Sequence, residues 1–160
     1  MATIKTKESL VTNHFTFTAP YGNTTTLGYA LKTNATGVVV GGDSATAPKA
    51  ADVIDLGGLP EGWCLTDAQV FITTGMTATV TGSLGFAYAD GVDDIDVPQD
   101  TAYFIKAGAD LATAGRLRAN GSKLVTLPKD ARLILTIAGA ANAKASDITV
   151  MVSGELTGAN

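Results

Sequence analysis

Five aspartates within eleven residues form the densest group of potential metal ligands in the sequence. They are Asp90, Asp93, Asp94, Asp96 and Asp100, in the stretch DGVDDIDVPQD. Oxygen clusters of this kind can hold Ca²⁺, but the spacing is not that of an EF-hand and no glutamate closes the group. We therefore favour a solvated acidic loop. A zinc site is nearly excluded, because the chain has one histidine and one cysteine.

The potential nucleophiles lack neighbours that would activate them. Cys64 lies between Trp63 and Leu65, which predicts a small buried hydrophobe. A catalytic thiol or serine needs a basic partner, and nothing marks the single histidine, His14, as a neighbour of either. The run Gly82-Ser83-Leu84-Gly85 only approaches a nucleophile elbow, and no phosphate-binding loop is present. The sequence predicts no enzyme and no cofactor.

Five basic residues lie within seventeen positions: Arg116, Arg118, Lys123, Lys129 and Arg132. Binding of single-stranded nucleic acid would need aromatic residues between them, and the net charge of −4 supplies no basic surface for a phosphate backbone. We expect no nucleic-acid partner. Two interpretations of the charged groups stay open, which are contacts between subunits and separate solvated faces. The candidate inter-subunit contacts are Asp90, Asp93, Asp94, Asp96, Arg116 and Arg118.

The elements that must position these residues are strands. The chain has 160 residues, of which 46% are hydrophobic and 16% are charged, and this balance excludes intrinsic disorder as the main state. It holds 23 threonines, 25 alanines and 18 glycines but only three glutamates. Threonine and valine favour strands, and long helices usually use more glutamate. No apolar run is long enough to span a bilayer, so we expect no membrane partner.

Period-two alternation is the strongest structural signal. From Met76 to Phe86 the apolar residues fall on one face and the hydroxyls on the other, and Ile148–Leu156 repeats the pattern. Further strands are expected at residues 27–32, 36–40, 51–56, 68–74, 101–106, 123–127 and 131–138. Residues 107–118 could hold a short helix. About nine strands separated by turns predict an all-β single domain, a jelly-roll-like antiparallel β sandwich.

The N-terminal segment carries large apolar residues but shows no strand pattern in its first nine positions. We divide the chain into residues 1–20, an N-terminal arm and first strand, and residues 21–160, the sandwich domain. Either the arm orders on a partner or it is an ordinary frayed terminus. An arm predicts that deletion of residues 2–9 leaves the fold unchanged and weakens binding. Its candidate contact residues are Ile4, Lys5, Lys7, Leu10, Phe15 and Phe17.

Several stretches resemble capsid decoration, or cement, proteins of tailed bacteriophages. They are YGNTTTLGYALKTNATG (21–37), DGVDDIDVPQDTAYF (90–104) with ATAGRLRANG (112–121), and LPKDARLILTIAGAANAKASDITVMVSGEL (127–156). The likeness covers most of the chain and lies in overall texture rather than in one short motif. Proteins of this kind have no catalytic residues to carry over.

The resemblance implies a structural virion protein that binds the outer capsid surface and stabilises the head. It implies the major capsid protein as partner, and a homotrimer as the common assembly. It also implies synthesis in the host cytoplasm, which agrees with the lack of a visible signal peptide in MATIKTKESLVTN. An alternative stays open, a carbohydrate- or receptor-binding β module of a virion spike or fibre. Such modules usually expose several aromatic residues, and aromatics are 6% of this chain.

Overall fold

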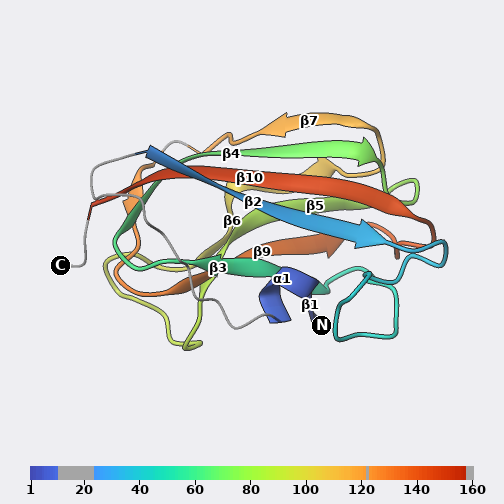
Figure 1. Ribbon diagram of the computed structural model, residues 1–160, viewed down its shortest axis with the longest axis horizontal. Coiled ribbons are helices and arrows are strands. Elements are labelled where there is room, and N and C mark those ends of the chain that lie inside the picture. Colours follow the sequence, from blue (N-terminus) through green and yellow to red (C-terminus); the bar gives the residue numbers. More distant parts are fainter. Residues whose placement is uncertain (11–23, 122, 158–160) are drawn as a thin grey trace.

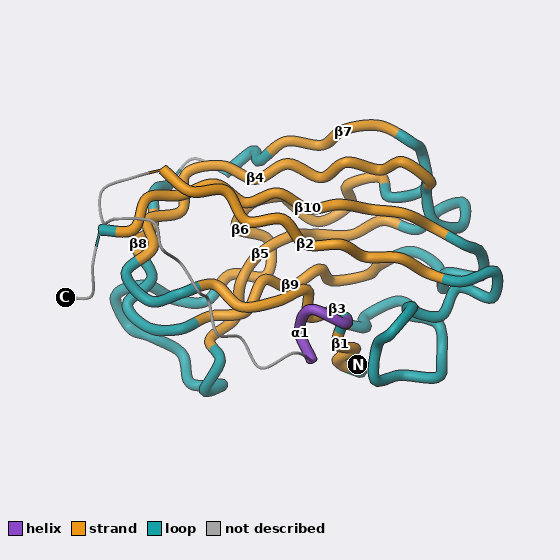
Figure 2. The backbone as a smooth tube through the Cα atoms, viewed as in Figure 1, coloured by secondary structure: helices purple, strands orange, loops and turns teal. Residues whose placement is uncertain are grey.

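Two β-sheets pack face to face in the computed structural model, with their strands running along its long axis (Figure 1). The structure describes residues 1–10, 24–121 and 123–157. Strands make up most of this part of the chain, and the loops gather at the ends of the sandwich (Figure 2). A single helical turn, α1 (Lys7–Leu10), is the one helix among the described residues.

Each sheet has five strands. The first has the order β1-β3-β9-β5-β6. Its bounds are β1 Thr3–Lys5, β3 Val53–Leu59, β5 Thr81–Tyr88, β6 Asp100–Asp110 and β9 Ala131–Ala138. The second has the order β2-β10-β4-β7, with the short β8 paired to β4. Its bounds are β2 Thr24–Thr33, β4 Trp63–Thr74, β7 Gly115–Arg118, β8 Val125–Thr126 and β10 Ser146–Leu156.

The strand order is that of a jelly roll. In β2-β10-β4-β7 and in β3-β9-β5-β6, strands from early and late parts of the sequence lie side by side, and all neighbours are antiparallel. Two Greek keys on two packed sheets give this arrangement. The predicted all-β, single-domain, jelly-roll-like sandwich is therefore confirmed. Strand β1 is the exception to antiparallel pairing, because it runs parallel to β3.

The core lies between the sheets and follows the alternation of the sequence. In β10 the side chains of Ile148, Val150 and Val152 are buried, and the residues between them are half-buried on the outer face. The first sheet differs, because most of β3 and β5 is buried on both faces. Both β1 and α1 contact β3, so the first ten residues cover one edge of this sheet.

Two expected strands are wrong, and a possible helix is not formed. The long strand expected from Met76 begins only at Thr81, because residues 76–80 form a turn in which Thr79 has a φ of 69°. The strand expected at 36–40 is a loop with a single bridge between Thr33 and Val39. The segment 107–118, which could have held a short helix, is instead the end of β6, a turn and β7. Pairing with β5 and β4 outweighs the helix propensity of its alanines there.

Candidate binding surfaces of the sandwich

Chemistry-bearing side chains do not converge in the described part of the chain. No three histidine, cysteine or carboxylate side chains lie together there as metal ligands. Ser83 is 6% exposed, and its hydroxyl donates to the Thr101 carbonyl oxygen at 3.0 Å. Cys64 is half-buried in β4, and His14 lies outside the described residues. None of the described segments forms a helix long and apolar enough to cross a membrane. The candidate sites are therefore surfaces.

The acidic stretch is a loop, as expected, and it connects β5 to β6. We call residues 90–99 the tip loop. Asp93 Oδ1 accepts hydrogen bonds from the N–H groups of Asp94 at 2.9 Å and Gln99 at 2.7 Å. Asp94 Oδ1 accepts from the N–H groups of Asp96 at 3.0 Å and Val97 at 2.9 Å. The carboxylates thus stiffen the loop by bonding to its own backbone.

Lys129 fixes the base of the tip loop. Its Nζ lies 2.7 Å from Asp90 Oδ2 and donates to the Val92 carbonyl oxygen at 2.7 Å. The same ammonium group stands 4.6 Å from the centre of the Tyr88 ring. The hydrogen bond from Lys129 holds the pKa of Asp90 below its usual value. Burial raises the pKa of Tyr88 to about 12, and the negative charges of the tip loop add to the effect.

The tip loop also carries apolar side chains into solvent. Ile95 is 94% exposed and Val92 is 61% exposed. A cavity of about 540 Å³ separates the tip loop from residues 123–128, where Leu124 is 68% exposed. Exposed apolar residues that gather beside a cavity are typical of binding surfaces. Sequence reasoning missed this surface, although Val92 and Ile95 are visible as apolar residues in an acidic stretch.

The two arginines expected to meet the acidic group lie in β7. Arg118 pairs with Asp67 at 3.2 Å. Arg116 hydrogen-bonds the Gln69 side chain, and its guanidinium lies 5.0 Å from the centre of the Phe71 ring. No ion pair joins either arginine to the tip loop within the described chain. Their contact with the tip loop of another subunit stays a prediction.

The first ten residues belong to the sandwich, which corrects the expectation that they hold no strand. Ile4 is 1% exposed because β1 pairs with β3 as the edge strand of the first sheet and places this side chain in the core. The Thr6 hydroxyl donates to the Leu56 carbonyl oxygen at 3.0 Å. Lys5 and Lys7 are exposed. Of the expected arm, Ile4 is therefore inaccessible while β1 is paired.

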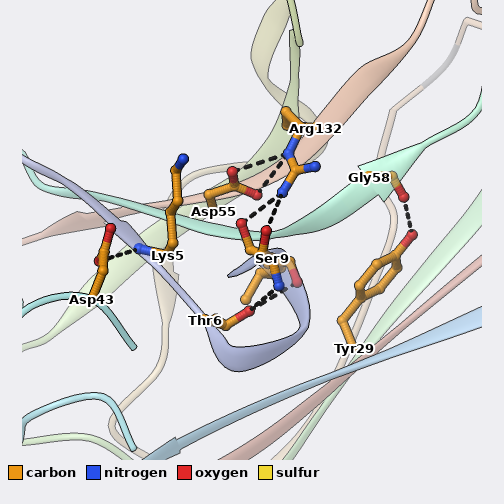
Figure 3. Close-up of polar contacts among 9 residues, drawn as sticks. Lys5, Thr6, Ser9, Tyr29, Asp43, Asp55, Gly58 and Arg132 are labelled. Atoms are coloured by element: carbon orange, nitrogen blue, oxygen red, sulfur yellow. Dashed lines mark hydrogen bonds and ion pairs between the residues drawn. The ribbon is translucent and has the colours of Figure 1, made fainter. Parts of the chain in front are cut away.

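A buried ion pair anchors α1 to the first sheet (Figure 3). Arg132 Nε in β9 lies 3.2 and 3.0 Å from the carboxylate oxygens of Asp55 in β3. The Nη2 of the same arginine donates to the Ser9 hydroxyl at 2.6 Å and to the Ser9 carbonyl oxygen at 3.3 Å. Nearby, the Tyr29 hydroxyl of β2 donates to the Gly58 carbonyl oxygen of β3 at 2.7 Å and joins the two sheets. The bonds from Arg132 to Ser9 hold the N-terminal residues against the sandwich.

A small apolar groove lies beside this anchor, between α1, β2 and the loop after β2. We call it the lysine groove. Its volume is about 240 Å³, and its lining residues are Thr6, Lys7, Ala30, Lys32, Val39 and Val40. Val40 is 55% exposed. Lys32 pairs with Asp147 at 3.1 Å, whereas Lys7 has no ion pair with a described residue.

Comparison with solved structures finds the same fold in phage particles. The chain is similar to a chain from the capsid of Ralstonia phage GP4, with 17% identity and a TM-score of 0.68 over 99% of this chain and 100% of that one. It is also similar to a chain from the capsid asymmetric unit of cyanophage Pam1, with 18% identity and a TM-score of 0.57 over 92% of this chain and 99% of that one. No family model and no curated protein matches the sequence. At these identities the likeness shows a shared fold.

Proposed function

We propose that the protein is a structural virion component without catalytic activity, which binds the outer capsid surface of a bacteriophage and stabilises the head. It would act as a decoration, or cement, protein. The observation that carries the proposal is the likeness to a chain from the Ralstonia phage GP4 capsid over 99% of this chain and 100% of that one. The jelly-roll fold occurs in proteins with many different functions. The proposed capsid role therefore rests on the phage origin of the similar chains and not on the fold alone. The second similar chain also comes from a phage capsid.

The surfaces support binding to a protein rather than a reaction. Leu124 lines a cavity and is 68% exposed, and Ile95 in the tip loop is 94% exposed. The tip loop around Ile95 is held in shape by its own carboxylates. A preformed loop loses little conformational entropy on binding. We propose the major capsid protein as the partner and the capsid exterior as the final location, after synthesis in the host cytoplasm.

We further propose that the N-terminal segment contributes to capsid binding. Lys5 and Lys7 are exposed and can reach a partner with β1 in place. Leu10 ends α1, and Phe15 and Phe17 lie outside the described residues. Replacing Lys5 by glutamate should leave the buried contacts of β1 intact, because the Lys5 side chain is exposed and does not line the lysine groove. The Lys5→Glu variant is expected to occupy fewer capsid sites than the wild type.

The proposed assembly is a homotrimer. The contact that the sequence suggests for this trimer sets the acidic residues of the tip loop, Asp93 and Asp96 among them, opposite Arg116 and Arg118 of the next subunit, although both arginines already have partners in their own chain. A heterologous contact of this kind closes into a ring when the rotation between subunits is one third of a turn. Crosslinking of the protein on capsids, followed by mass measurement of the products, tests the trimer.

Cosedimentation with capsid shells that lack the protein tests the function. We expect the purified protein to pellet with shells at a fixed ratio and to saturate. The same measurement with a bacterial surface polysaccharide serves as the control for a carbohydrate-binding module. Binding to polysaccharide without binding to shells would replace the proposal by that alternative.

A further inference from the structure

The tip loop has an exposed apolar side chain flanked by exposed carboxylates. Ile95 is 94% exposed, and the neighbouring Asp93 and Asp96 are exposed on either side of it. None of Asp93, Asp94 and Asp96 has an ion pair with a described residue. A partner that buries Ile95 must therefore supply an apolar socket and positive charge at its rim.

The lysine groove has these two properties. Its lining includes the apolar residues Ala30, Val39 and Val40, and Val40 is 55% exposed. Lys7 and Lys32 stand in its wall. Lys7 is exposed and is without an ion pair in the described segments, so its charge is available to an incoming carboxylate.

The two surfaces lie apart in one copy of the chain. The tip loop follows the end of β5, where Tyr88 pairs with Ala131 at the start of β9. The groove lies beside the second half of β2, whose Thr33 pairs with Ser146 at the start of β10. In Figure 1 the tip loop is the yellow-green loop at the lower left, and α1 and the end of β2 lie to its right. Only a second copy can bring tip and groove together.

We propose that the tip loop of one copy docks into the lysine groove of a second copy, with Ile95 in the groove and Asp93 and Asp96 beside Lys7. The contact is heterologous, so each copy uses its tip on one neighbour and its groove on another. Such a contact builds a ring or an open chain. It needs no capsid, and its test in solution is therefore independent of the capsid-binding test.

Arg116 and Arg118 are the competing partners for the tip loop on a second copy. Both are already engaged, Arg118 with Asp67 and Arg116 with Gln69 and Phe71. Docking there would have to compete with these contacts, whereas Lys7 of the lysine groove has no ion pair with a described residue. The groove is favoured for this reason.

Two variants break the contact from opposite sides. The tip variant combines Ile95→Ser with Asp96→Lys and keeps the capping carboxylates of Asp93 and Asp94. The groove variant is Lys7→Glu. The matched control is Lys106→Glu, which reverses the charge of an exposed lysine in β6, away from both surfaces.

Sedimentation equilibrium from micromolar to millimolar concentration measures the association. We expect the wild type and Lys106→Glu to associate as concentration rises, and the tip and groove variants each to associate about tenfold more weakly or worse. All four proteins should have the same far-UV circular dichroism. A mixture of the tip and groove variants should form a heterodimer and nothing larger, because one intact tip and one intact groove remain.

Several results would overturn the proposal. A wild type that stays monomeric over the whole range would do so, as would a mixture of the two variants that forms no heterodimer. Arg118→Glu tests the competing contact. Association that survives Lys7→Glu but is lost in Arg118→Glu would move the docking site to β7 and reject the groove.

Discussion

The N-terminal ten residues and the tip loop are both short segments at the margin of the sandwich. Their side chains differ in whether they contact the rest of the fold or stay within the segment and in solvent. The N-terminal residues send theirs inward, with Ile4 in the core and Ser9 bonded to Arg132. The tip loop bonds to itself through Asp93 and Asp94 and leaves its apolar residues in water. The first segment therefore contributes to the stability of the fold, and the second has the exposed apolar side chains on which its proposed contact role rests.

This difference shows that position at a chain end does not decide whether a segment is loose. Several partners of the first segment lie far away in the sequence, as in the Thr6 bond to Leu56 and the Ser9 bond to Arg132. Long-range contacts of this kind stabilise the folded state as a whole. The bonds that Asp93 and Asp94 make span only a few residues, so they set the local shape of the tip loop and contribute little to the overall free energy of unfolding.

Deletion of residues 2–9 should give the largest loss of stability. It removes β1 and the buried Ile4, and loss of a buried isoleucine side chain alone costs about 2–5 kcal/mol. The expected loss is at least that of Ile4→Ala, measured by urea unfolding. A deletion variant as stable as the wild type would instead favour the loose arm considered from the sequence.

Asp55→Ala should have the next largest effect. It leaves Arg132 largely buried without its carboxylate, and breaking a buried pair costs about 3–5 kcal/mol. Because the Arg132 side chain is 24% exposed, we expect about 2–3 kcal/mol from the same reasoning. The double variant Asp55→Leu, Arg132→Met removes both charges and should recover most of the loss in urea unfolding. No recovery would mean that the pair itself is not what holds this site.

Asp94→Ala should cost little stability and loosen the tip loop. It removes the acceptor for the N–H groups of Asp96 and Val97, and a hydrogen bond contributes about 0.5–1.5 kcal/mol. Amide hydrogen exchange of those two groups should quicken, while exchange in β10 stays unchanged. Asp94→Asn retains an acceptor oxygen and should exchange as the wild type does. Equal exchange in Asp94→Ala would show that other contacts hold the loop.

The smallest effect concerns pH. Lys129 holds the pKa of Asp90 below its usual value of 3.8. A carboxyl group with a lowered pKa in the folded state stabilises the fold above that usual value, and the contribution is lost as pH falls through the folded-state pKa. The stability difference between the wild type and Asp90→Asn should therefore shrink on acidification below pH 3.8. A difference that is independent of pH would contradict this assignment.

The strands with clean alternation could be predicted from the sequence. Residues 131–138 coincide with β9, and the pattern from Ile148 matches most of β10. Strand β1 could not, because three residues become a strand only through pairing with β3, fifty residues away. The turn at 76–80 resembles a strand in its sequence pattern because Met76 and Val80 are both buried. An alternating sequence pattern therefore indicates which side chains are buried. It indicates a strand only where a neighbouring strand is present to pair with it.

The candidate surfaces were predictable in part. The aspartate spacing indicated the acidic loop, but its binding character depends on Ile95 pointing outward, which no spacing shows. The buried pair of Asp55 and Arg132 was missed because the two residues are far apart in sequence. Its signal was a single charged residue inside each of the apolar runs VIDL and ARLIL.

Electron cryomicroscopy of undecorated capsid shells mixed with the purified protein tests the central claim most directly. The proposal predicts added density on the outer surface at repeated positions, into which the jelly-roll sandwich fits. Shells that look the same with and without saturating protein would contradict it.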